Sequence, residues 1–237
     1  MSIVIPAFVN TESSLSRLKR LIESIQSQTF NDVEVVVADH SLGDRAETYL
    51  RNASLRIKYI RNHHDLGNSS ANTNLGLSIA EGELIQVMHC DDWYSSHDAI
   101  SLFVQELNRL PGVHWGVFAF DHWDEESDHI YNPLIPSLDR SLGNPSTTFF
   151  RRHCAQQVKF DNCLININDH DFHQSLLFRF GPPVIIREYC VRIGMSDANV
   201  AKKLSQKRML QEIRYHQHKL DLQYDNLKRN YEAKTGH

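Results

Sequence analysis

Three residues of the run His89-Cys90-Asp91-Asp92 could hold a divalent metal ion, namely His89, Asp91 and Asp92. Mn²⁺ and Mg²⁺ bind carboxylate oxygens, and a histidine can bind a metal or contact a phosphate. An isolated pair of aspartates is more often a solvated turn, in which the second aspartate caps the next segment. Here the pair directly follows a continuous apolar run at positions 84–88. This run and the residues upstream favour a metal site made by His89, Asp91 and Asp92.

The elements that would position this site alternate along the first ninety residues. Continuous apolar runs predict buried strands at 2–5, 33–38, 57–60 and 84–88. Pro6 would stop the first strand. Helical spacing of apolar residues predicts helices at 15–25, 45–51 and 70–80, the first capped by Thr11 or Ser13. This order predicts an α/β fold with a mainly parallel sheet flanked by helices, and ligands of such sheets bind beyond the carboxyl ends of the strands.

The second half has a less regular pattern. We expect helices at 99–110 and 169–180, strands at 115–120 and 184–193, and a loop at 131–145. A long helix is predicted from residue 199 onward. Within it a three-four spacing suits a coiled-coil seam, made by Leu210, Ile213, Gln217, Leu220, Tyr224, Leu227 and Tyr231. We expect a packing or self-association role for this helix. Its basic residues would also suit an anionic membrane surface, although a solvated face is their more common role.

Composition excludes several classes of protein. The 237 residues are 41% hydrophobic and 23% charged, which is ordinary for a folded globular protein, and the net charge of −4 does not suggest nucleic-acid binding. Neither a signal peptide nor an apolar stretch of roughly 20 residues appears. The four cysteines form no CxxC pair, so we expect reduced thiols. These observations predict a cytoplasmic protein, or one lying on the inner face of the cell membrane.

Several ordered motifs resemble the opening of the family-two inverting glycosyltransferases, which have the GT-A fold. They are SIVIPAF at 2–8, QTF at 28–30, EVVVADHS at 34–41, NSSANTNLGLSIAEG at 68–82 and HCDD at 89–92. Weaker similarity continues at 149–152, 160–161 and 168–169. The resemblance implies a GT-A-like, Rossmann-type fold with a nucleotide-sugar-binding half at 1–93. An acceptor-binding half would follow at 94–196, and the C-terminal helix would occupy 197–237.

The resemblance also implies roles at matching positions. The nucleotide of the donor, with UDP the first expectation, would bind at Pro6, Ala7, Phe8, Asn10, Asp39, Ser70, Asp91 and Arg192. Asp39 would accept a hydrogen bond from the base, and Arg192 would approach the diphosphate unless it is a surface arginine on a strand. Mn²⁺ or Mg²⁺ would bind at Asp91. Asp169 would be the catalytic base, although a helix N-cap is an equal alternative at its position.

Two residues depart from the family pattern. His89 replaces the first aspartate of the DxD motif, and Asn168 replaces the glutamate before the base. The missing glutamate removes a neighbouring negative charge, so the pKa of Asp169 should be raised less by repulsion. The expected acceptor is a hydroxyl of a saccharide or lipid-linked saccharide, because family members commonly build surface polysaccharide, O-antigen or capsule.

Other functions fit the residues less well. A nucleotidyltransferase or a dinucleotide-binding dehydrogenase would carry a glycine-rich loop after the first strand, and Pro6 to Asn10 contain no glycine. Zinc binding around Cys163, His170 and His173 matches no structural zinc spacing. Trp123 could stack on a sugar ring or belong to the core. The remaining alternative is a non-catalytic nucleotide-binding or scaffold protein of the same fold.

Overall fold

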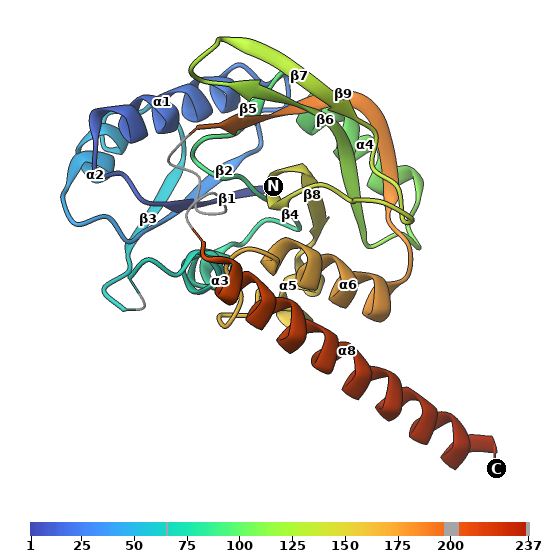
Figure 1. Cartoon of the computed structure of the whole chain (residues 1–237). Helices are drawn as coiled ribbons and strands as arrows, with labels where there is room; N and C mark the ends of the chain where they lie inside the picture. Colours follow the sequence, from blue (N-terminus) through green and yellow to red (C-terminus); the bar gives the residue numbers. More distant parts are fainter. Residues whose placement is uncertain (65, 197–203, 236–237) are drawn as a thin grey trace.

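The computed structural model describes residues 1–64, 66–196 and 204–235, and a mixed sheet of nine strands forms the centre of this part of the chain (Figure 1). The strands are β1 (Ser2–Ala7), β2 (Glu34–Asp39), β3 (Ile57–Arg61), β4 (Leu84–Val87), β5 (Trp93–Tyr94), β6 (Trp115–Asp124), β7 (His129–Leu134), β8 (Thr148–Arg151) and β9 (Val184–Met195). Their order is β3-β2-β1-β4-β8-β6-β9-β5, and β7 pairs with β6. Strands β1 to β4 pair in parallel, as do β6 and β9. This arrangement confirms the predicted α/β fold.

Helices cover both faces of the sheet. The side chains of β1 alternate between the two faces, as a strand requires: Ile3 and Ile5 belong to one apolar core and Val4 to the other. The first core packs against α1 (Glu12–Gln26), α2 (Arg45–Leu50) and α4 (Ala99–Arg109). The second packs against α3 (Ser69–Ile79), α5 (Arg152–Gln157) and α6 (Asn168–Phe180) (Figure 1). The sheet is therefore buried between two helical layers.

The first strand continues through Pro6, which corrects the prediction that it stops there. Pro6 pairs with Ala38 of β2, and β1 ends at Ala7. The Met88 N–H donates to the Val4 carbonyl, so Val4, and Pro6 two residues later, present their backbone nitrogens toward the β4 side. Strand β4 ends at Val87, before it would meet Pro6. The missing N–H of proline therefore leaves no gap in the ladder.

The second half differs from prediction in four places. Strand β7 covers part of the expected loop at 131–145, and the short elements β8, α5 and the 3₁₀ helix η1 (Pro145–Thr147) were not predicted. Strand β6 extends to Asp124. The C-terminal helix α8 spans Gln206–Thr235, so it begins after the predicted residue 199; residues 199–203 lie outside the described part of the chain. None of the helices in the described residues is long and apolar enough to cross a membrane.

A single sheet crosses the predicted boundary at residue 93. Strand β4 of the first half pairs with β8 of the second, and β5 begins at the boundary itself. Strand β9 then returns alongside β5 and β6. The halves 1–93 and 94–196 are therefore a proposed division of roles within one sheet, and the C-terminal helix follows them.

Candidate active site

A group of potential metal ligands lies in the turn after β4. One ligand atom from each of His89, Asp91 and Asp92 lies within 4.8 Å of the others. His89 is half-buried and its backbone N–H donates to the Ser146 hydroxyl over 2.9 Å. Burial lowers the pKa of His89, while the neighbouring Asp91 carboxylate opposes this shift. A lowered pKa favours the neutral imidazole, which is the form that binds a metal.

Asp92 is anchored more firmly than its two neighbours. It is 2% exposed. Its carboxylate accepts hydrogen bonds from the Gly194 N–H over 3.0 Å and from the Asn144 amide over 3.1 Å. Burial, and next the charge of Asp91, raise the pKa of Asp92 to about 8. Two carboxylates and an imidazole so close together in a buried turn fit a hard divalent cation, whose charge would offset the repulsion.

A cluster of two arginines and two tryptophans lies next to this turn, made by Arg20, Arg192, Trp93 and Trp123. The Arg20 guanidinium lies 3.9 Å from the ring centroid of Trp93 and 4.5 Å from that of Trp123, and it donates to the Asp91 carbonyl over 3.2 Å. Arg192 forms a two-point ion pair with Asp121 at 2.7 and 2.9 Å. Sequence reasoning missed Arg20, because a basic residue of an amphipathic helix normally faces solvent. Trp123, for which a sugar-stacking role or a core position was expected, contacts Arg20 and Trp93 in this cluster.

The residues predicted to bind the nucleotide after β1 have different environments. Phe8 is 50% exposed, and its ring meets His40 edge to face with centroids 4.9 Å apart. The Asn10 side chain accepts from the Leu42 N–H over 2.7 Å, which joins the loops after β1 and β2. Pro6 is half-buried, whereas Ala7 is fully buried in the core. Phe8 therefore offers an open aromatic face, while the predicted role of Ala7 toward the nucleotide stays a prediction.

Asp39 is fully buried at the end of β2, with both carboxylate oxygens bonded. One oxygen accepts from the backbone N–H and hydroxyl of Ser41, and the other accepts from the Tyr59 hydroxyl over 2.7 Å. Arg61 approaches the second oxygen at 3.5 Å. The carboxylate thus holds the loop that follows β2. The predicted contact of Asp39 to a base stays a prediction.

The predicted base lies at the first turn of α6. The Asp169 carboxylate accepts from the His170 N–H over 2.7 Å, and burial raises its pKa. Asn168 donates to the Ser70 hydroxyl over 3.2 Å, and Ser70 in turn donates to the Leu164 carbonyl over 3.1 Å. Ser70 is 1% exposed, so it ties α3 to the segment that carries Asp169. Its predicted role toward a nucleotide remains a prediction.

The alternative zinc site is not assembled. His173 is buried and pairs with the Thr148 hydroxyl over 2.6 Å, with its ring stacked on Trp115. His170 is exposed. Within the described ranges, His89, Asp91 and Asp92 form the one group of three or more such side chains that could share an ion.

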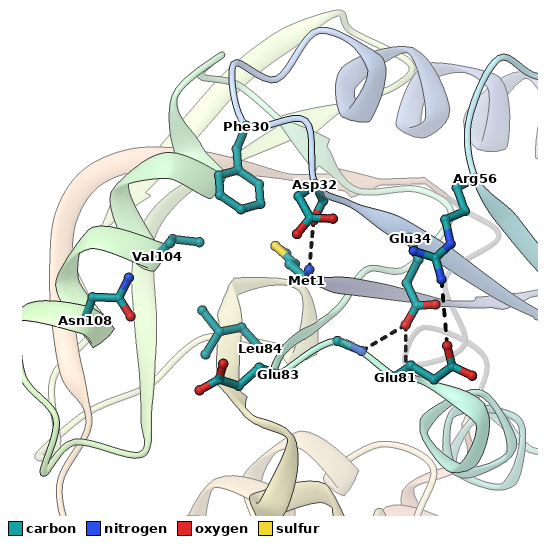
Figure 2. Close-up of a pocket in the computed structure, with 11 residues that line it drawn as sticks. Met1, Phe30, Asp32, Glu34, Arg56, Glu81, Glu83, Leu84, Val104 and Asn108 are labelled. Atoms are coloured by element: carbon teal, nitrogen blue, oxygen red, sulfur yellow. Dashed lines mark hydrogen bonds and ion pairs between the residues drawn. The ribbon is translucent and has the colours of Figure 1, made fainter.

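A cavity of about 440 Å³ lies at the opposite edge of the sheet, where the parallel strands begin. Its wall includes Met1 and Glu34 at the starts of β1 and β2, and Leu84 at the start of β4 (Figure 2). Figure 2 shows Glu34 bonded to the backbone after α3 and the Met1 amino group bonded to the chain at Asp32. Ligands of parallel sheets bind at the carboxyl edge, so this cavity is separate from the candidate active site.

Comparison with known sequences shows that this chain is similar to glycosyltransferases. The sequence model described as glycosyl transferase family 2 matches residues 2–175. A GalNAc(5)-diNAcBac-PP-undecaprenol beta-1,3-glucosyltransferase of Campylobacter jejuni is 32% identical over 112 residues, which cover 46% of this chain and 35% of that protein. An uncharacterized glycosyltransferase of Mycobacterium tuberculosis is 28% identical over 133 residues, or 55% of this chain and 50% of that protein. The aligned regions thus span half or less of these curated relatives.

Solved structures share the fold at low sequence identity. Staphylococcus aureus TarS in complex with UDP-GlcNAc superimposes with a TM-score of 0.71 at 16% identity, covering 86% of this chain and 61% of that one. The mannosyltransferase PcManGT of Pyrobaculum calidifontis, in complex with GDP-Man and Mn²⁺, gives a TM-score of 0.64 at 15% identity. The match covers 92% of this chain and 63% of that one.

Proposed function

This chain belongs to glycosyl transferase family 2, and from that premise we propose that it transfers a sugar from a nucleoside diphosphate sugar to an acceptor hydroxyl. The observation that carries the proposal is the group His89, Asp91 and Asp92 at the carboxyl edge of the sheet. A DxD-like turn at this place can hold the diphosphate of a donor through a divalent cation. Mn²⁺ or Mg²⁺ bound there would neutralise the charge of the departing diphosphate.

The proposed reaction is a direct displacement with inversion at the anomeric carbon. The acceptor oxygen forms a bond to that carbon while the bond from the carbon to the diphosphate oxygen breaks. The proton of the acceptor hydroxyl passes to the Asp169 carboxylate, and the nucleoside diphosphate leaves. The raised pKa of Asp169 supports this role, because a base works best when its pKa lies closer to the operating pH.

For the donor we propose a UDP-sugar held between the ends of β1 and β2. Phe8 would stack on the base, and Asn10 would support the loop at Leu42 that borders it. TarS binds UDP-GlcNAc and the Pyrobaculum mannosyltransferase binds GDP-Man, so proteins of this fold accept more than one base. Arg192 is already paired with Asp121, and we propose that it supports the diphosphate site from this fixed position.

For the acceptor we propose a saccharide or lipid-linked saccharide, in surface polysaccharide synthesis. The name of the Campylobacter relative specifies an undecaprenol-linked oligosaccharide. A protein acting on such a lipid works at the membrane surface, and we propose a cytoplasmic chain with peripheral contact there. Trp93 and Trp123 would offer aromatic surface to a sugar ring. Their ring centroids are 5.3 Å apart, and they lie next to the proposed metal ligands.

We also propose that two copies associate through α8. Among seam positions with described side chains, Leu210 is 54%, Ile213 47% and Tyr224 68% exposed, Gln217 is exposed, and Leu220 is half-buried. The three-four spacing of these residues suits pairing with an identical helix. The seam faces away from the side of α8 that packs on its own chain through Glu212 and His216.

Calorimetric titration with UDP, GDP and dTDP, each with and without Mn²⁺, tests the donor proposal. We expect Mn²⁺-dependent binding of one nucleotide, which also identifies the donor class. A non-catalytic protein of the same fold would bind a nucleotide without hydrolysing or transferring the matching donor sugar. Absence of binding to all three nucleotides would contradict the proposal and would direct attention to His89, which replaces the family's aspartate.

A further inference from the structure

The first half of α8 packs on one particular segment, residues 161–171, while its far end extends beyond the rest of the molecule (Figure 1). This segment runs into the first turn of α6, and that turn carries Asp169. The family match ends at residue 175, so α8 lies outside it. The contacts between α8 and the segment are therefore a feature of this chain beyond the matched domain.

One set of contacts satisfies the backbone before α6. Helix α6 begins after Ile167, whose apolar side chain cannot cap it. Glu212 of α8 is 2% exposed, and its carboxylate accepts from the Asn166 N–H over 2.8 Å and the Ile165 N–H over 3.2 Å. Arg208 pairs with Glu212 over 3.1 Å and donates to the Cys163 carbonyl over 2.9 Å. Amides left without an acceptor in such a partly buried turn would be unfavourable.

A second set of contacts neutralises the first turn of α6. Asp171, two residues after Asp169, is 1% exposed. Its carboxylate lies 2.7 Å from the Lys219 amino group and 3.1 Å from the His216 ring nitrogen, both on α8. Lys219 also reaches Asp161 at the start of the segment over 3.0 Å. A buried carboxylate is strongly unfavourable without such partners, so α6 depends on α8 at this turn.

We infer that Glu212, His216 and Lys219 are positioning residues, which hold residues 161–171 so that the Asp169 carboxylate stays in place for the acceptor hydroxyl. This inference rests on the proposed function, in which Asp169 is the base. The proposed metal ligands are anchored by other contacts: Asp92 bonds to Gly194 in β9. Loss of the α8 contacts should therefore reduce turnover and leave donor affinity unchanged.

Amide hydrogen exchange of the full chain tests the holding role directly. In Glu212→Ala we expect exchange of the Ile165 and Asn166 amides to accelerate roughly tenfold or more, because each loses its acceptor. Glu212→Gln keeps one acceptor oxygen and should show a smaller increase, which protects the test if the alanine variant does not fold. Unchanged exchange of the segment in both variants would overturn the inference.

Steady-state kinetics tests the consequence for the base. Lys219→Met should lower kcat about ten- to a hundredfold through misplacement of Asp169, with Kd for UDP within roughly twofold of wild type. Lys219→Arg should restore most of the turnover. His216→Ala should act like Lys219→Met, whereas His218→Ala, on the exposed side of the same helix, should not.

The outcomes separate this inference from the proposed function. Faster exchange in 161–171 with unchanged kcat would overturn the positioning role. A wild-type protein that transfers and hydrolyses no donor would contradict the proposed function, and exchange would then decide alone whether α8 holds the segment. A parallel loss of UDP affinity and turnover would also overturn the inference, because it would indicate a general loss of structure.

Discussion

The carboxylate of Asp92 accepts a hydrogen bond from the backbone N–H of Gly194 over 3.0 Å, and these residues are 102 positions apart in the chain. The bond joins the turn after β4 to the end of β9. A Cβ atom at Gly194 would lie 2.2 Å from the Asp91 carbonyl oxygen, so only glycine lets the two backbones approach this closely. The proposed metal site therefore depends on a strand near the end of the sheet as well as on its own motif.

Gly194→Ala should separate the turn from β9. We expect a loss of roughly 1–3 kcal/mol in the free energy of unfolding, as for other overpacked sites. Metal-dependent nucleotide binding should weaken with it, since Asp91 and Asp92 would shift. Urea unfolding and calorimetry measure the two effects. Gly112→Ala is the matched control, because a Cβ there meets no atom within 4 Å. Equal behaviour of the two variants would contradict the close-approach argument.

Asp91→Ala should abolish the part of donor affinity that depends on the metal. The variant removes one of three clustered ligands and leaves the buried, anchored Asp92 in place. We expect UDP affinity in saturating Mn²⁺ to equal the affinity without metal. Asp221→Ala, at an exposed position of α8, serves as a control for loss of an acidic residue away from the proposed site. Undiminished Mn²⁺-dependent binding in Asp91→Ala would contradict the metal assignment.

Asp169→Asn should cut turnover by at least ~10²-fold, the lower end of a general-base contribution, with donor affinity nearly intact. The wild-type rate should fall as pH drops through the pKa of Asp169, which burial raises above its ordinary value. Below that pKa the base carries the proton it must accept. Full activity in the asparagine variant would mean that the base lies elsewhere.

Asn168→Asp tests the effect of the missing neighbouring charge. A carboxylate at this position should raise the pKa of Asp169 by repulsion and move the acid limb of the pH–rate profile upward by roughly one pH unit. The same change also removes the hydrogen bond from Asn168 to Ser70. Ser70→Ala removes that bond without adding charge, so its acid limb should stay at the wild-type position. If the acid limb moved by the same amount in both variants, the cause would be the lost hydrogen bond to Ser70 and not the added charge.

The first ninety residues were predictable because their pattern is local. Apolar runs such as 33–38 and the Thr11 cap of α1 need no information from elsewhere, and the strands and helices appear where expected. The metal group was also predictable, since its three residues lie within four positions. Pro6 was misjudged because its tolerance depends on where the neighbouring strand β4 ends, which is a property of the sheet.

Contacts between distant segments could not be predicted from the sequence. The bonds of Asp39 to Tyr59 and Ser41 appear only in the folded chain, and its predicted contact to a base stays a prediction. Arg20 resembles any exposed arginine of an amphipathic helix until Trp93 and Trp123 meet it. In α8 the apolar seam predicted packing or self-association, and it gave no sign that Glu212 on another side of the helix is buried, with its partners supplied by the turn before α6.

Glu34 at the start of β2 should govern stability in acid. Burial alone would raise its pKa, but hydrogen bonds from the Ser2 hydroxyl, Lys58 and the backbone N–H groups of Glu81 and Gly82 lower it to about 2. Figure 2 shows the two backbone bonds. A depressed pKa stabilises the fold above the unfolded value, and this contribution disappears as pH falls from the unfolded value toward 2. The shift corresponds to roughly 3 kcal/mol of unfolding free energy.

Glu34→Gln should therefore lose roughly 3 kcal/mol at pH 7 and show a flatter dependence of stability on pH between about 5 and 2. Urea unfolding across that range measures both quantities. Glu188→Gln, at an exposed position of β9, should change the unfolding free energy by no more than about 0.5 kcal/mol. Donor binding should be unaffected in Glu34→Gln under conditions where the protein is folded, because Glu34 lies at the amino edge of the sheet and the proposed nucleotide site at the carboxyl edge. A wild-type pH dependence in Glu34→Gln would show that other carboxylates govern acid unfolding.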